Sequence, residues 1–276
     1  MKKLKCLSVL LLSVFSTVLF AQEYKRDVEY TEALYNFIEA YYNNSIASEE
    51  EADRLYSDAV SSISEDASEY EKEVQFARCD YLYGMYSMGE YDLESIQKIK
   101  NINDTKDKNE NASETIKQKK AKAASYFDSG IEHAQKAIKL ENRSDAVLIY
   151  VMCLSSNCTV KPTSYVIGNG LKVQSNAKKA IALDPKNGTA YFYQWAQDLY
   201  APEFFANYKR GYNKMYSNYN DENLHFEKFD RFNFLIAIGD SFLKRHDNDS
   251  AKIWYDKAKA YYPNNRTLKK IYDKNY

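Results

Sequence analysis

The chain has 276 residues, with 38 Lys and Arg against 39 Asp and Glu, so its net charge is close to zero. A protein that binds the phosphate backbone of nucleic acid needs a clustered surplus of Lys and Arg, and no helical stretch of this sequence carries one. Gly and Pro are few, at eight and four residues. Ala, Glu, Lys and Leu recur at three- and four-residue spacings, which predicts an all-α protein that does not bind nucleic acid.

Residues 1–21 have the features of a signal peptide. The segment Met1–Lys5 is basic and precedes an apolar run, Leu7–Phe20. The run has about 14 residues, whereas a helix needs roughly 20 to span a bilayer, so a permanent anchor is the poorer interpretation. Cys6 lies before the apolar run and therefore cannot be the lipid-modified cysteine of a lipoprotein. We expect a soluble exported protein, periplasmic if the source is bacterial, with residues 22–276 forming one domain.

The first elements of that domain are predicted to be two helices. Residues 30–42 form the first, and the second carries a stripe of Ala52, Tyr56 and Ala59. A polar insert then interrupts the pattern near residues 90–118, because Asn and charges of both signs leave little to bury. A solvated, flexible loop is the simpler interpretation of this insert, and a lid over a groove is the alternative.

The stripe of the second helix recurs twice in the middle of the chain. Its copies are Gly130, Ala134 and Ala137, and Val173, Ala177 and Ala180. These copies are 43 residues apart. This spacing is longer than a repeat of about 34 residues. We attribute the excess to a turn-rich stretch, Pro162–Gly170, which precedes a helix that begins near Leu171. Residues 188–219 are then expected to form a degenerate hairpin with a first helix over 189–199.

The C-terminal residues carry the strongest repeat signal. With Phe232 as position 1 of a 34-residue unit, positions 4, 7, 8, 11, 20, 24, 27 and 32 are Leu235, Ile238, Gly239, Phe242, Ala251, Tyr255, Ala258 and Pro263. Large residues at positions 4, 7 and 11 make one face of a first helix, while small residues at positions 8 and 20 let a second helix approach closely. Proline at position 32 ends the second helix, because it has no N–H to donate.

This pattern resembles the tetratricopeptide-repeat (TPR) superfamily along nearly all of the chain after the leader. The resemblance implies a right-handed superhelix of about five antiparallel hairpins that serves as a binding scaffold, without catalysis or cofactor. The chain is also similar, more weakly, to the exported TPR accessory component of periplasmic TRAP transporters. That second resemblance implies a partner in solute transport.

The repeat register also predicts which residues line a concave groove. The candidates are Tyr81, Met85, Met88, Ile149, Cys153, Phe192, Ile236, Asp240 and Lys244. This lining is apolar and aromatic with few cations, which favours a hydrophobic peptide segment, a partner helix or a hydrophobic small molecule. Contact of these residues with the chain's own insert or with another subunit of a homo-oligomer is the alternative.

No arrangement of residues in the sequence indicates catalysis or metal binding. The turn Gly168-Asn-Gly170 lacks the Lys-Ser/Thr of a phosphate-binding loop, and the three histidines are scattered singly. Cys153 and Cys158 are close enough in sequence that a disulfide stays open as a possibility. We therefore expect a protein that is not an enzyme and holds no metal. Its function is either to bind a protein or peptide partner, or to hold a small ligand or the binding protein of a solute transporter.

Overall fold

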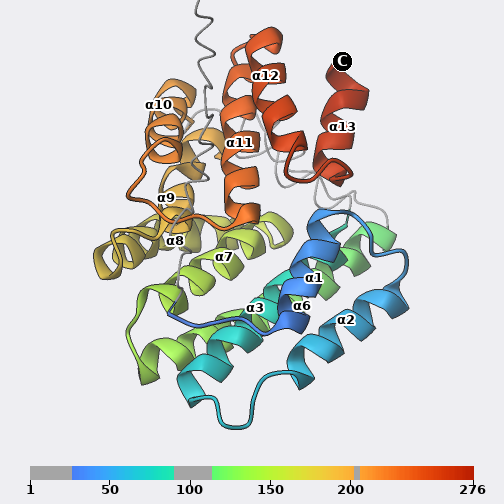
Figure 1. Cartoon of the computed structure of the whole chain (residues 1–276), viewed down its shortest axis with the longest axis vertical. Helices are drawn as coiled ribbons and strands as arrows, with labels where there is room; N and C mark the ends of the chain where they lie inside the picture. The colour runs from blue at the N-terminus through green and yellow to red at the C-terminus, as the bar shows by residue number, and fades with distance from the viewer. Residues whose placement is uncertain (1–26, 90–113, 202–205) are drawn as a thin grey trace, which may run out of the picture.

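The structure is a computed structural model that describes residues 27–89, 114–201 and 206–276, and these residues fold into helices (Figure 1). The elements are α1 (Glu32–Tyr42), α2 (Glu49–Ser61), α3 (Glu69–Met88), α6 (Glu114–Leu140), α7 (Ser144–Val160), α8 (Thr163–Leu183), α9 (Gly188–Tyr200), α10 (Tyr208–Tyr219), α11 (Lys228–Leu243), α12 (Asn248–Lys259) and α13 (Arg266–Asn275). Within the described residues the only β interaction is an isolated bridge between Asn187 and His225. The all-α prediction is confirmed.

Short polar side chains start the first three helices. Thr31, Ser48 and Ser68 each accept a hydrogen bond from a backbone N–H in the first turn that follows. At α3 the cap is reciprocal, because Glu71 accepts a hydrogen bond from the backbone N–H of Ser68 at 2.9 Å. Each cap satisfies donors that the helix itself leaves without a partner, and so fixes where the helix begins.

Helices that follow one another in the sequence pack against one another in space. This holds from α6 through α12, and α3 packs most extensively against α6, the next described helix. In Figure 1, α1, α2, α3 and α6 occupy the lower part of the molecule and α9 to α13 the upper part, with α7 and α8 between them. Most of the packing therefore joins helices that are neighbours in the chain.

Two of these helix pairs share one detail of packing. Gly84 of α3 lies under the ring of Phe127 of α6, where an added Cβ would stand 2.6 Å from Cε1. Gly239 of α11 lies in the same way under the ring of Tyr255 of α12, at 2.4 Å. A larger residue at either glycine would overlap the ring. Both pairs thus approach closely where a glycine on the first helix meets an aromatic ring on the second.

The first and last parts of the chain also meet. The ring of Tyr42, at the end of α1, stacks on Phe229 at 5.7 Å and on Tyr262 at 5.2 Å between ring centroids. Asn265, just before α13, donates a hydrogen bond to the carbonyl oxygen of Tyr42 at 2.8 Å. We call this junction of α1 with α11 and the start of α13 the seam. It joins residues about 190 to 220 positions apart.

Two predicted segments are corrected or delimited by the structure. The stretch Pro162–Gly170 is not a turn, because α8 runs without interruption from Thr163. Pro162 lies just outside the helix, where no N–H is needed, and two glycines in a helix cost only about 2 kcal/mol together. Of the predicted insert, residues 114–118 are helical as the start of α6, and residues 90–113 lie outside the described residues.

A search of the described helices for one that is both apolar enough and long enough to cross a membrane found none. The predicted leader, residues 1–21, lies outside the described residues.

Candidate functional site

The structure buries most of the residues predicted to line a groove. Five of them are at most 9 % exposed, namely Tyr81, Met88, Ile149, Cys153 and Ile236. Met85, Phe192, Asp240 and Lys244 are half-buried. In the described conformation, five of the nine positions are therefore covered.

The chain itself covers the buried members of this set. The hydroxyl of Tyr81 lies 3.5 Å from that of Tyr193 on α9. The guanidinium of Arg78, itself 1 % exposed, lies 5.1 Å from the Tyr81 ring and 4.9 Å from the Phe229 ring. A buried cation is stabilised by such contacts with ring faces. Residues of α3, α9 and α11 thus meet around Tyr81 and Arg78 at the predicted inner side.

Asp240 and Lys244 lie in a polar cluster that joins α9, α11 and α12. The carboxylate of Asp240 accepts hydrogen bonds from the hydroxyls of Tyr200 and Tyr255, each at 2.7 Å. The ammonium of Lys244 donates to the carbonyl oxygen of Leu199, which belongs to the last turn of α9. Burial lowers the pKa of Lys244 to about 8, and the carboxylate of Asp240 acts in the opposite direction. The two side chains connect helices and cap the end of α9.

A group of aromatic side chains stays partly accessible in the C-terminal half. Five rings of α10, α11 and α12, which we call the aromatic face, lie edge to face or tilted against one another: Tyr212, Tyr216, Tyr219, Phe242 and Trp254. Four of the five are half-buried and Tyr216 is 43 % exposed.

Cations lie over the rings of the aromatic face. The guanidinium of Arg245 is 4.5 Å from the ring of Phe242, and the ammonium of Lys257 is 4.0 Å from that of Trp254. Exposed Tyr, Trp and Arg are the residues in which protein interfaces are enriched. Sequence reasoning did not identify this face, although Tyr212, Tyr216 and Tyr219 follow the spacing of one helix stripe.

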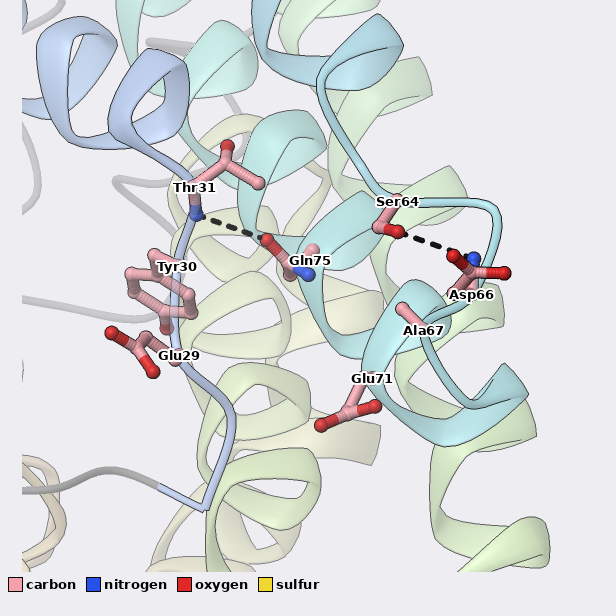
Figure 2. A pocket seen from close by; sticks show the side chains of 8 residues that line it. All are labelled: Glu29, Tyr30, Thr31, Ser64, Asp66, Ala67, Glu71 and Gln75. Atoms are coloured by element: carbon pink, nitrogen blue, oxygen red, sulfur yellow. Dashed lines mark hydrogen bonds between the residues drawn. The ribbon is translucent and has the colours of Figure 1, made fainter.

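A surface pocket of about 410 Å³ lies where the N-terminal segment crosses α3 (Figure 2). Its lining includes the carboxylates of Glu29, Asp66 and Glu71. The backbone N–H of Thr31 donates to the side-chain oxygen of Gln75 at 3.2 Å and closes one wall. Glu71 already accepts hydrogen bonds from Ser68 as part of the cap of α3, so one of the three carboxylates of this acidic pocket is engaged by the fold itself.

A buried polar cluster inside the N-terminal half was also missed. Asp80 accepts a hydrogen bond from the hydroxyl of Tyr56 at 2.7 Å, and its second oxygen lies 3.9 Å from Nε2 of His133. The other ring nitrogen of His133 contacts Glu73. Burial raises the pKa of Asp80, against hydrogen bonds from Ser129 and Tyr56. Glu73 and Asp80 are seven residues apart and share a helix face, which was the signal in the sequence.

The cysteines after the leader are all free thiols. Cys153 and Cys158 lie on one continuous helix, α7, where a separation of five residues turns their side chains about 140° apart. A disulfide between them does not form in this conformation. Burial raises the pKa of Cys158 to about 11, so its thiol is protonated and weakly nucleophilic at neutral pH.

Within the described residues, no three or more His, Cys, Asp and Glu side chains are grouped so that they could hold a metal ion. Comparisons with family models and with curated proteins found no match.

Proposed function

We propose that the protein is an exported, TPR-like scaffold that binds a protein or peptide partner. The repeated packing of a glycine against an aromatic ring, in α3 with α6 and in α11 with α12, supports a repeat architecture. Stacked hairpins of this kind suit a superhelix of about five units. The signal peptide predicted from the sequence, residues 1–21, supports export.

The aromatic face carries the proposal of a binding function. Its rings are rigid, large and held by their neighbours, so binding a partner there freezes little side-chain motion. The predicted groove is the weaker location, because five of its nine residues are buried by the chain itself. We therefore place the partner on α10, α11 and α12, and expect it to contribute apolar side chains and backbone acceptors for the hydroxyls of Tyr212 and Tyr216.

The test is site-specific photo-crosslinking in the source cell. A photoreactive amino acid replaces Tyr216 in one protein and Tyr276 in a matched control, since these two tyrosines are 43 % and 46 % exposed. We expect one partner to be cross-linked through position 216 and not through 276. The double variant Tyr212→Ser, Tyr216→Ser should then bind the purified partner at least about tenfold more weakly, and Tyr276→Ser within about twofold of wild type. The same cross-linked proteins at both positions, or none at 216, would reject the proposal.

A further inference from the structure

The N-terminal half of α8 projects apolar side chains into open space. Ile167 and Leu171 are 67 % and 73 % exposed, which makes them the most exposed large hydrophobic residues of the described chain. They are four residues apart and therefore share one side of the helix. Around Gly168 and Gly170 an added Cβ would meet no other atom within 4 Å. Tyr165 on the other side of this half of the helix contacts Asn157 of α7, whereas nothing described in the molecule covers Ile167 and Leu171.

The charges of α8 are all of one sign. Its 21 residues include Lys172, Lys178 and Lys179 and no Asp or Glu. None of these three lysines forms an ion pair within residues 27–89, 114–201 and 206–276, whereas lysines elsewhere do, such as Lys228 with Glu39 and Lys252 with Asp256. The three lysines are exposed, so the helix presents uncompensated positive charge to solvent.

The apolar and basic residues lie on the same side of α8. Each residue of a helix is turned about 100° from the one before it. Measured around the axis from Ile167, Lys178 and Leu171 therefore lie within about 40°, and Lys179 and Lys172 within about 140°. We call these five residues the α8 face. An apolar strip flanked by lysines is the arrangement of helices that lie in the interface between a membrane and water.

We propose that the α8 face docks the protein on an anionic lipid surface. A second copy of the chain fits poorly, because two α8 faces would bring like charges together. A stable protein interface buries about 800 Å² on each partner around a shaped apolar centre, and two aliphatic side chains on a convex helix do not supply one. A lipid surface needs no complementary shape. It receives the aliphatic side chains among its acyl chains and the lysines among its headgroups.

The experiment measures sedimentation of the chain from Gln22 onward with vesicles, so that the apolar run Leu7–Phe20 cannot bind lipid itself. The shortened chain contains every described residue. Vesicles of phosphatidylcholine are compared with vesicles that also contain phosphatidylglycerol, at low and at high salt. We expect binding only to the anionic vesicles, weakened by salt.

Two variants test the α8 face, each with a matched control. Changing Lys172, Lys178 and Lys179 to Gln should weaken binding to anionic vesicles about a hundredfold, while changing Lys117, Lys119 and Lys139, which are exposed on α6, should change it less than about threefold. Ile167→Ser with Leu171→Ser should weaken binding about tenfold or more, and Ile253→Ser, at a site 57 % exposed on α12, should not.

Three results would overturn the proposal. One is no binding of the wild type to anionic vesicles. Another is binding that the α8 variants leave unchanged while circular dichroism shows them folded. The third is a wild type that binds soluble polyglutamate, or self-associates, and does not bind vesicles, with a lysine variant that has lost this binding. That result would assign the face to an acidic protein or to a second copy.

Discussion

The middle of α3 and the middle of α9 show how differently the two halves of the chain bury their helices. Every residue of α3 from Ala77 to Gly84 is buried, whereas every residue of α9 from Tyr191 to Gln197 is only half-buried. The number of neighbours does not explain this, because α3 packs against α1, α2, α6 and α7, and α9 against α7, α8, α10 and α11. The difference lies in how completely the neighbouring helices cover each helix.

Small residues of α3 let neighbouring helices approach closely, and the large side chains between them, such as Arg78 and Tyr83, are covered as well. Ala77, Cys79 and Gly84 belong to the buried run of α3. The corresponding run of α9 includes Phe192 and Trp195. A close-packed interior loses free energy when any part of it is removed, while a half-covered ring offers surface to other molecules. The buried run of α3 is thus part of a stable framework, and both proposed binding faces lie in the C-terminal half.

The largest expected effect comes from removing one phenylalanine ring from each half of the chain. It tests whether the two rings contribute differently to stability. Phe127 is fully buried against Gly84, and Phe127→Ala should lower the free energy of unfolding by about 3–5 kcal/mol. Phe192 is half-buried on α9, and Phe192→Ala should lower it by about 1 kcal/mol. Urea denaturation followed by circular dichroism measures both. Equal losses would show that the two halves are equally well packed.

Overpacking is the next largest effect. A leucine at Gly239 would overlap the ring of Tyr255, so Gly239→Leu should lower the free energy of unfolding by about 1–3 kcal/mol and speed proteolysis of α11 to α13. Gly168→Leu is the control, because that site is open and the helix gains a better helix-forming residue. Thermal melting that is unaffected by Gly239→Leu would mean that the close contact of α11 with α12 is not tight in solution.

The local sequence pattern predicted where the helices lie better than it predicted which residues pack against them. The spacing of Leu235, Ile238 and Gly239 placed the last hairpin, and the region 188–219 does hold two helices, α9 and α10. These assignments rest on turn-by-turn periodicity, which depends on neighbours within one helix. The exception was α8, where Gly168 and Gly170 were interpreted as a turn although the helix tolerates them.

What covers a helix face could not be predicted, because it depends on distant parts of the chain. Tyr81 is correctly spaced for an inner side, but it is buried against Tyr193 of α9, which lies far along the sequence. Asp240 and Lys244 show the same limit. Nothing near them indicates that Tyr200 and the carbonyl oxygen of Leu199 will be their partners.

A smaller effect concerns the seam between the halves. The side chain of Asn265 caps α13 by accepting from the backbone N–H of Thr267 at 2.9 Å, and also donates to the carbonyl oxygen of Tyr42. Asn265→Ala should therefore lower the free energy of unfolding by about 1–2 kcal/mol and raise amide exchange in α1. Asn207→Ala removes a helix cap alone, at α10, and should leave exchange in α1 unchanged. Unchanged exchange in α1 after Asn265→Ala would mean that the seam does not hold the halves together.

The smallest expected effect is on the pH dependence of stability, which should differ between one lysine in each half of the chain, Lys244 and Lys122. Burial lowers the pKa of Lys244 to about 8, although the carboxylate of Asp240 acts in the opposite direction. At Lys122, burial would also lower the pKa, but hydrogen bonds to Glu49 and to the hydroxyl of Tyr83 outweigh it and raise the pKa instead. The two lysines therefore affect stability over different ranges of pH.

The sign follows from where each proton is bound. Between pH 8 and about 10.4 the unfolded chain keeps the Lys244 proton while the folded chain loses it, so stability gained from this group rises with pH in that window. Lys122 stays protonated in both states up to about pH 10.4, so its contribution is constant below that value and is lost only above it. Tyr83, which accepts a hydrogen bond from Lys122, has its pKa raised to about 12 by burial, so its hydroxyl stays protonated in the folded chain up to pH 9.5.

We therefore expect the free energy of unfolding of wild type, relative to Lys244→Met, to rise by about 1 kcal/mol from pH 7 to pH 9.5, because partial exposure screens most of the shift. Relative to Lys122→Met, it should stay constant over the same range. Urea denaturation at several pH values measures both differences. A flat difference for Lys244 would show that its ammonium is well solvated, and hence that the end of α9 is open to water rather than capped.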